Sequence, residues 1–196
     1  MLRGEDLSVI RGERLVFRGL RFAIPAGGAL VLAGANGSGK STLLRLMAGL
    51  IRPDAGSLFW NDADVSADAV PHGARVAFVG HQDAVKPGLT AAENLAFAAG
   101  ASGLPVPRAL ESQGLETLAD LPARLLSAGQ KRRLALCRLV LSRAALWLLD
   151  EPTVGLDQAA IARLGDVLAQ HRAAGGMIAA ATHVALPLPD AAELRL

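Results

Sequence analysis

The pattern of hydrophobic and polar residues changes its period several times along the chain. Between Leu15 and Ile24, apolar and polar residues alternate, as they do in a half-exposed antiparallel strand. Four later runs are short and almost wholly apolar, which is typical of strands buried inside a sheet. These runs are Ala29 to Ala33, Arg75 to Gly80, Ala145 to Leu149 and Met177 to Ala181. We therefore expect a mainly parallel sheet core, with an antiparallel β part near the N-terminus.

Between these runs, apolar residues recur at the three- and four-residue spacing of helices. The helices expected from this spacing are Lys40 to Ile51, Gly129 to Leu141 and Asp157 to Ala174. From Thr90 to about Leu121 the spacing is also helical, and Thr90 with Glu93 three residues later forms a capping box. Pro105 and Pro107 divide this stretch, which indicates two or three short helices.

Strands that alternate with helices predict an α/β fold in which helices flank the sheet. The chain has 196 residues, about the length of one domain, and it shows no internal repeat or low-complexity linker. We therefore expect a single domain over residues 1–196. The helical block between two buried strands indicates a helical subdomain inserted at approximately residues 83–143.

Composition narrows the function classes. With 52% hydrophobic and 19% charged residues, the chain is too hydrophobic and too weakly charged to be intrinsically disordered. No run of about 18 uncharged apolar residues is present, and the first residues carry both charge signs, so we expect a cytoplasmic protein without a signal peptide. The net charge of +2 does not suggest a nucleic-acid partner. The single cysteine, Cys137, excludes an internal disulfide and is expected to pack in the core.

A glycine-rich stretch follows the first buried strand. Residues 34–41 read G-A-N-G-S-G-K-S and match G-x-x-x-x-G-K-[ST] between a strand and a helix, the context of a phosphate-binding loop. Glycines let backbone N–H groups converge on phosphate oxygens, and the helix N-terminus favours an anion. We expect Lys40 to reach the β- and γ-phosphates and Ser41 to bind Mg²⁺. The predicted nucleotide-binding residues are Gly34, Ala35, Asn36, Gly37, Ser38, Gly39, Lys40, Ser41 and Thr42.

Two adjacent carboxylates end a later apolar strand, in the sequence L-W-L-L-D-E at residues 146–151. A triphosphate site needs a second contact to Mg²⁺ and a group that handles water. Asp150 is the candidate partner of Mg²⁺, directly or through its water. Glu151 is the candidate general base or water-orienting residue.

Further motifs resemble those of ABC transporter ATPases, and with the phosphate loop they follow that family's order over about 150 of the 196 residues. The resembling positions are Gln82 for the Q-loop, Leu126, Ser127, Ala128, Gly129 and Gln130 for the L-S-G-G-Q signature, Gly155, Leu156 and Asp157 for the D-loop, and His183 for the switch histidine. The residues after the signature resemble the family's signature helix.

The resemblance implies ATP and Mg²⁺ as cofactors and a head-to-tail homodimer of nucleotide-binding subunits. Each ATP would lie between the phosphate loop of one subunit and the signature motif of the other, where Ser127 and Gly129 contact its γ-phosphate. His183 would hold the γ-phosphate and the attacking water. Gln82 would contact Mg²⁺ and connect the site to integral membrane subunits.

Two positions depart from the family pattern. Arg11 stands where the family usually has an aromatic residue against adenine, and its guanidinium group could stack on the base instead. Ala128 replaces the first signature glycine, where one methyl group should be tolerated. Lys131, Arg132 and Arg133 follow the signature and are predicted to form a solvated face of the helix.

Other segments resemble the ATP-binding subunits of bacterial cytochrome c maturation systems. They are residues 11–14, 52–56, 80–86 and 89–95, together with Trp60. This resemblance implies a peripheral subunit at the cytoplasmic face of the inner membrane, which couples ATP hydrolysis to haem export or to release of a haem-loaded periplasmic chaperone. His72, His81, His171 and His183 show no pattern of a direct haem site.

Other readings remain open. The chain could serve another small ABC exporter, or it could be a soluble ABC ATPase of the iron–sulfur assembly type, whose members also have one domain. A P-loop kinase is a third possibility, but it gives no account of L-S-A-G-Q at residues 126–130.

Overall fold

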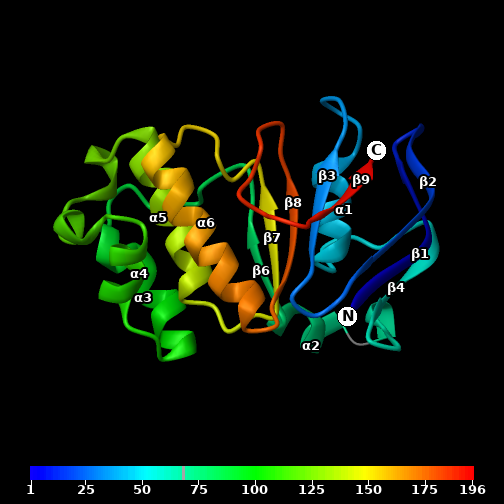
Figure 1. The fold of residues 1–196 in the computed structure, drawn as a ribbon, viewed down its shortest axis with the longest axis horizontal. Coiled ribbons are helices and arrows are strands. Elements are labelled where there is room, and N and C mark those ends of the chain that lie inside the picture. Colours follow the sequence, from blue (N-terminus) through cyan, green and yellow to red (C-terminus); the bar gives the residue numbers. More distant parts are fainter. Residues whose placement is uncertain (68) are drawn as a thin grey trace.

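The computed structural model describes residues 1–67 and 69–196. Its centre is a five-stranded parallel sheet in the order β6-β7-β8-β3-β9 (Figure 1). These strands are β6 (Val76–Val79), β7 (Leu146–Asp150), β8 (Met177–Ala181), β3 (Ala29–Ala33) and β9 (Ala192–Arg195). An antiparallel sheet has the order β2-β1-β4-β5. Its strands are β1 (Leu2–Arg11), β2 (Arg14–Ile24), β4 (Ala55–Trp60) and β5 (Ala63–Asp64). The predicted fold class is confirmed.

Helices pack on both faces of the parallel sheet. The described helices are α1 (Lys40–Met47), α2 (Ala69–Ala74), α3 (Ala91–Ser102), α4 (Val106–Ser112), α5 (Ala128–Val140) and α6 (Gln158–Ala173). Helix α1 and the antiparallel sheet share a core with one face, whereas α5 and α6 share a core with the other. In Figure 1, α3 and α4 lie at one end of the molecule and the antiparallel sheet at the opposite end. Among the described residues, no helix combines the length and apolar character needed to cross a membrane.

The strand β7 shows why the central strands are apolar throughout. Leu146 and Leu148 point into the core shared with α1, and Trp147 and Leu149 point into the core shared with α5 and α6. Because neighbouring strand residues face opposite sides, a strand covered on both faces needs apolar side chains at every position. All five residues of β7 are buried, including the terminal Asp150.

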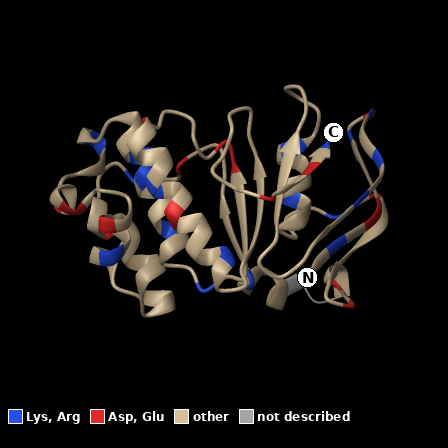
Figure 2. Ribbon diagram, viewed as in Figure 1, with Lys and Arg blue, Asp and Glu red and all other residues tan. Residues whose placement is uncertain are grey.

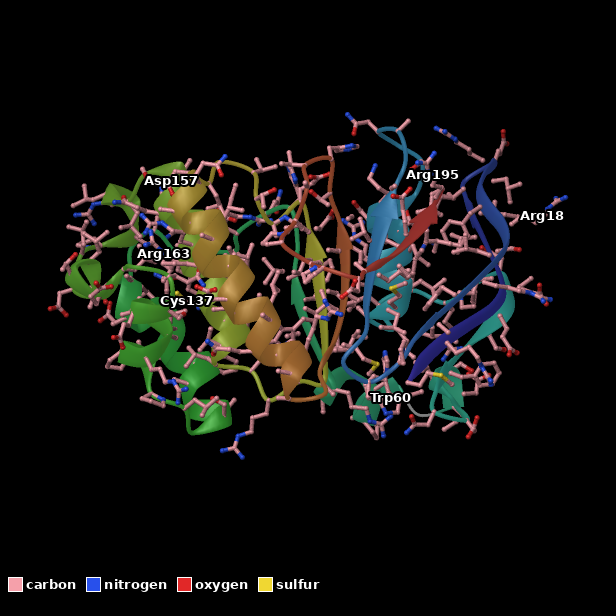
Figure 3. All side chains as sticks on the ribbon, viewed as in Figure 1. Arg18, Trp60, Cys137, Asp157, Arg163 and Arg195 are labelled. Atoms are coloured by element: carbon pink, nitrogen blue, oxygen red, sulfur yellow. The ribbon has the colours of Figure 1, made fainter. Side chains whose placement is uncertain are left out.

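A third core holds α3, α4 and α5 together, and α5 also contributes to the core against the sheet. The predicted capping box at the start of α3 is confirmed, because Thr90 Oγ1 accepts from the N–H of Glu93 at 3.1 Å and Glu93 Oε2 accepts from that of Thr90 at 2.8 Å. Cys137 lies in this helical core, as expected (Figure 3). Burial raises the pKa of its thiol to about 12.

The sequence pattern overestimates the length of α1 and does not specify α2, β1, β4, β5 or β9. Helix α1 ends at Met47 rather than at Ile51, because Gly49 adopts φ +72° and turns the chain while Leu50 remains 64% exposed. The strand β9 was not predicted. It is short and mostly exposed, and it forms because it pairs in parallel with β3, a contact that local periodicity does not reveal.

His171 ties α6 to the parallel sheet. Its ring stacks on Trp147 with centroids 3.7 Å apart and 5° between the planes, and its Nε2 lies 3.3 Å from the carbonyl oxygen of Met177. Burial lowers the pKa of His171. The unfolded chain therefore takes up this proton more readily than the folded chain, so folding stability is lost as the pH falls below the unfolded-state pKa of about 6.5.

We expect the His171→Phe variant to lose less stability than the natural chain when the pH falls from about 7.5 to about 5, because phenylalanine keeps a ring against Trp147 but binds no proton. Thermal unfolding of both proteins at the two pH values measures the difference. Equal losses in the two proteins would show that His171 does not contribute to acid destabilisation.

Candidate nucleotide-binding site

The glycine-rich loop joins the end of β3 to the start of α1, where the sequence pattern predicts it. Gly39 forms the N-cap of α1 with φ +107°, in the left-handed region that favours glycine. A Cβ atom at this position would lie 2.5 Å from Cγ1 of Val16 on β2. The close approach explains the glycine and places β2 beside the loop.

The loop offers groups that suit an anion. Lys40 is only 7% exposed, and its Nζ donates to the carbonyl oxygens of Gly34 at 2.8 Å and Ala35 at 3.0 Å. Within residues 1–67 and 69–196, no carboxylate forms an ion pair with Lys40. The hydroxyl of Ser38 is buried there without a hydrogen-bond partner. A buried ammonium without a counter-ion is unfavourable, so these residues fit a bound phosphate chain.

A cleft of about 670 Å³ opens over this loop. Its walls come from the antiparallel sheet, the phosphate loop, the segment after β6, the end of β7 and the segment after β8. The lining residues are Arg11, Arg14, Val16, Asn36, Gly37, Gly39, Lys40, Ser41, Thr42, His81, Asp150, Glu151, Val154, His183 and Val184. The structure therefore brings the predicted loop, carboxylates and histidine into one cleft.

Glu151 and His183 are in contact. His183 Nε2 lies 3.3 Å from Glu151 Oε1, and the backbone N–H of His183 donates to Oε2 at 3.3 Å. Glu151 itself adopts φ +50°, which costs a non-glycine residue roughly 1 to 3 kcal/mol. Its N–H donates to the carbonyl oxygen of Ala181 at 2.8 Å. The carboxylate is thus held beside the imidazole by a strained turn.

The hydroxyl of Ser41 and the carboxylate of Asp150, which is 5% exposed, both line the cleft. Mg²⁺ prefers oxygen ligands and usually takes only one or two from the protein, the rest coming from phosphate and water. Ser41 and Asp150 fit that requirement. Gln82, also predicted for Mg²⁺, is exposed and lies outside the cleft lining, where its neighbour His81 takes a place.

Arg11 lines the cleft together with Arg14 and Val16, and its contact with the base stays a prediction. We did not predict these two residues as part of the site. The signal for Arg14 was present in the sequence, because it lies three residues after Arg11 across a tight turn between paired strands.

The signature motif lies in a second, smaller pocket of about 180 Å³, which it shares with the D-loop. Leu126 is buried and Ala128 is exposed. Ser127 caps α5 by accepting from the N–H of Gln130 at 3.2 Å, and Gln130 Oε1 accepts from the N–H of Ser127 at 2.8 Å. A Cβ atom on Gly129 would lie 2.6 Å from the carbonyl oxygen of Gly155.

Asp157 in the D-loop caps the other long helix. Its Oδ1 accepts from the N–H of Ala160 at 2.7 Å, at the start of α6 (Figure 3). The D-loop and the signature motif therefore each have a local structural role, because each supplies the N-cap residue of a helix.

The prediction of a solvated face at residues 131–133 is wrong for Arg132. Helix α5 carries four basic residues (Figure 2). Arg132 is only 4% exposed and points at the turn after β7. Its neighbour Arg133 donates to the carbonyl oxygens of Gln113 at 2.9 Å and Gly114 at 3.0 Å. Sequence periodicity missed these contacts because the acceptors lie far from α5 along the chain.

The family model for ABC transporters matches residues 17–154, and the chain belongs to the ABC transporter family. Full-length relatives place it more narrowly. It is 55% identical to the cytochrome c biogenesis ATP-binding export protein CcmA of Rhodospirillum rubrum, over 98% of this chain and 84% of that protein. It is 52% identical to the CcmA protein of Paramagnetospirillum magneticum, over 98% of this chain and 92% of that protein, and 46% identical to that of Salmonella typhi, over 98% and 93%.

Solved structures agree with this assignment. The ATP-binding subunit of an ABC transporter superposes with a TM-score of 0.83 at 28% identity, over 93% of this chain and 79% of that chain. A dimeric, post-hydrolysis ATP-binding cassette bound to ADP and Pi shares the fold, with a TM-score of 0.82 at 23% identity over 94% and 88%. The chain is an ABC-type ATPase that binds ATP.

Proposed function

We propose that this chain is the ATP-hydrolysing subunit of an ABC transporter complex for cytochrome c biogenesis. The observation that carries the enzymatic part is the single cleft that gathers Lys40, Ser41, Asp150, Glu151 and His183. Relatives that share about half of this chain's residues are named cytochrome c biogenesis ATP-binding export proteins, which supports the assignment to cytochrome c biogenesis.

Each cleft residue has a role that suits its surroundings. Lys40 neutralises the β- and γ-phosphates of ATP, and the N–H groups of the glycine loop donate to their oxygens. Ser41 and Asp150 hold Mg²⁺, which supplies charge stabilisation when it is bound. Glu151 accepts a proton from the attacking water, and His183 fixes the orientation of that carboxylate through the 3.3 Å contact.

We also propose that residues 1–196 form one nucleotide-binding domain, with the helical subdomain at approximately 83–143, and that two copies associate head to tail. The signature residues lie outside the cleft lining of their own chain, and Ser127, Gly129 and Gln130 line a different pocket. A second copy would place its signature motif over the first cleft. The N-terminus of α5 would then add its positive dipole end to the bound phosphate.

The complex would lie at the cytoplasmic face of the bacterial inner membrane, with this chain as a peripheral subunit bound to integral membrane subunits. Hydrolysis would drive haem export or the release of a haem-loaded periplasmic chaperone. Gln82, which is exposed on the segment after β6, would contact the membrane subunits and join the Mg²⁺ site only when that segment moves.

A pull-down from detergent-solubilised membranes tests the transporter assignment. We expect the tagged full chain to retain integral membrane proteins at a fixed ratio, and the tag alone to retain none. A pool that stays soluble and has no membrane partner would contradict the proposal and favour the soluble ATPase reading.

A Glu151→Gln chain in the same complex distinguishes haem export from release of the haem-loaded chaperone. Accumulation of haem-loaded chaperone on the membranes indicates chaperone release, whereas loss of periplasmic haem indicates export.

A further inference from the structure

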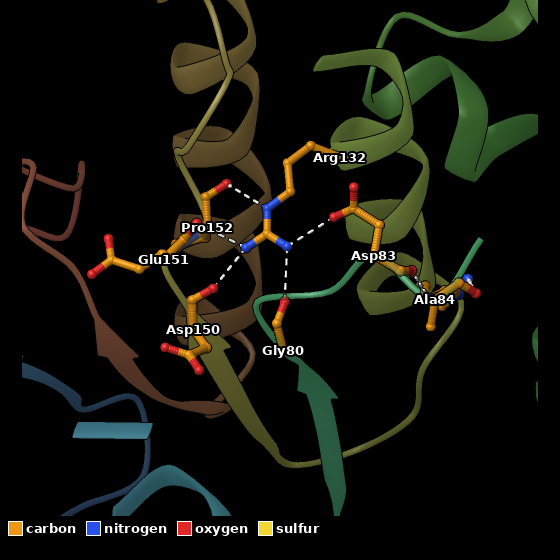
Figure 4. A network of polar contacts seen from close by, with 8 residues as sticks. Gly80, Asp83, Ala84, Arg132, Asp150, Glu151 and Pro152 are labelled. Carbon is orange, nitrogen blue, oxygen red and sulfur yellow. Dashed lines mark hydrogen bonds and ion pairs between the residues drawn. The ribbon is translucent and has the colours of Figure 1, made fainter. Parts of the chain in front are cut away.

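Arg132 on α5 forms five hydrogen bonds, and all five acceptors belong to residues outside this helix. Its Nε donates to the carbonyl oxygen of Pro152 at 3.3 Å. Its Nη1 donates to the carbonyl oxygen of Gly80 at 2.9 Å and to Oδ1 of Asp83 at 3.0 Å. Its Nη2 donates to the carbonyl oxygens of Asp150 at 2.7 Å and Glu151 at 2.8 Å (Figure 4).

This set matches the donors of arginine one for one. A guanidinium group has five N–H bonds, one on Nε and two on each terminal nitrogen, in a fixed plane. Each nitrogen of Arg132 has as many acceptors as it has hydrogens. Lysine cannot replace it, because an ammonium offers three donors from a single point.

The acceptors belong to two chain segments that lead into the cleft. Three are consecutive carbonyls at the end of β7, those of Asp150, Glu151 and Pro152, and the other two lie in the segment after β6. Glu151 is the residue with φ +50°. A strained turn persists only where its surroundings fix it. The Arg132 guanidinium holds the carbonyl groups on both sides of the Glu151 N–Cα bond, whose rotation is this φ angle.

We propose that Arg132 is a positioning residue for Glu151. This proposal rests on the proposed catalytic role of Glu151. Arg132 touches no reacting atom, because its bonds go to four backbone carbonyls and to the side chain of Asp83, and none goes to the Glu151 carboxylate. Through those bonds it sets where the Glu151 side chain leaves the turn, and through Gly80 and Asp83 it sets the spacing between that turn and the segment that carries Gln82.

The position of Arg132 on α5 extends this role to the second subunit. The helix begins at the Ser127 cap, and Arg132 follows five residues later, within the second turn. If the signature motif contacts nucleotide on a second copy, as proposed above, one short helical segment connects that contact to the turn that holds Glu151.

The Arg132→Lys variant of the full chain, purified with the membrane proteins that it retains, tests the proposal. We expect kcat for ATP hydrolysis to fall by about 10- to 100-fold, because small displacements of a catalytic group have effects of that size. The dissociation constant for ATP should stay within about threefold, since Arg132 does not line the nucleotide cleft. A merely structural role would lower the number of nucleotide-binding sites and leave kcat per site unchanged.

Arg172→Lys is the matched control. Arg172 donates to the carbonyl oxygens of Gly27 at 2.8 Å and Pro189 at 2.6 Å, so it also joins distant loops, but its partners lie outside the cleft lining. We expect it to lower the melting temperature and to keep kcat. If Arg132→Lys does not fold, Asp83→Asn weakens the same anchor, and kcat should fall severalfold with unchanged ATP affinity.

Wild-type kcat in both Arg132→Lys and Asp83→Asn would overturn the positioning role. The Glu151→Gln variant, measured in parallel, separates that failure from failure of the proposed function. If Glu151→Gln is inactive and Arg132→Lys is normal, only the positioning role is wrong. If Glu151→Gln hydrolyses ATP normally, the catalytic role of Glu151 is wrong.

Discussion

We expect Glu151→Gln to lower the rate of ATP hydrolysis by about 10²- to 10⁴-fold and to leave ATP binding intact, because general-base catalysis contributes factors of that size. The amide has the shape of the carboxylate, so the contacts with His183 at 3.3 Å can persist. The substitution removes only the ability of the side chain to accept a proton. Steady-state phosphate release and equilibrium ATP binding, measured on the same preparation, separate these two properties.

The same variant should trap a dimer. If each ATP lies between the phosphate loop of one chain and the signature motif of the other, ATP that is not hydrolysed holds two chains together. Size-exclusion chromatography with ATP should therefore show a dimer for Glu151→Gln and a mixed or monomeric population without nucleotide. Glu116→Gln, at an exposed position in the helical part, is the control and should hydrolyse ATP normally. Unchanged turnover in Glu151→Gln would show that another group is the base.

Lys40→Ala should weaken ATP binding by roughly 30-fold or more, because truncating one partner of a buried charge pair costs about 2 to 5 kcal/mol. The Lys40 ammonium is 7% exposed, and the loop carbonyls of Gly34 and Ala35 do not neutralise it. Removing it should not destabilise the nucleotide-free chain much, since a buried charge without a counter-ion is itself unfavourable.

Thermal unfolding with and without ATP measures this effect. A ligand present at 100 times its dissociation constant stabilises the folded state by about 2.7 kcal/mol. That stabilisation should be seen in the natural chain and in Arg45→Ala, a substitution of an exposed cation on the same helix, and at the same ATP concentration it should fall to about 0.9 kcal/mol or less in Lys40→Ala. An ATP-dependent shift of undiminished size in Lys40→Ala would overturn the assignment of the phosphate loop.

The cleft could be predicted from the sequence where its parts are local. The phosphate loop, the carboxylate pair after β7 and the switch histidine each follow a buried strand, and the carboxyl ends of parallel strands meet at one edge of the sheet. For Lys40, Asp150 and His183, a place at the end of a buried strand was therefore enough to predict that they lie in one cleft.

Other features depend on contacts between distant segments, which local patterns do not encode. The basic run at residues 131–133 has the composition of a solvated helix face, but Arg132 meets carbonyls of residues that lie 18 to 20 positions further along the chain. The strand β9 forms only because the exposed edge of β3 is available to it. No local pattern indicates that His81, rather than Gln82, lines the cleft.

The packing of the signature motif against the D-loop makes its two central positions unequal. At position 128 the side chain faces solvent, so a methyl group meets nothing that opposes it. At position 129 a methyl group would lie 2.6 Å from the Gly155 carbonyl oxygen, too close for any real contact. Within one chain, only the second glycine is a steric requirement of the packing against the D-loop. The packing therefore tolerates the sequence L-S-A-G-Q, and searches for related chains should allow alanine at the third position of the motif and keep glycine at the fourth.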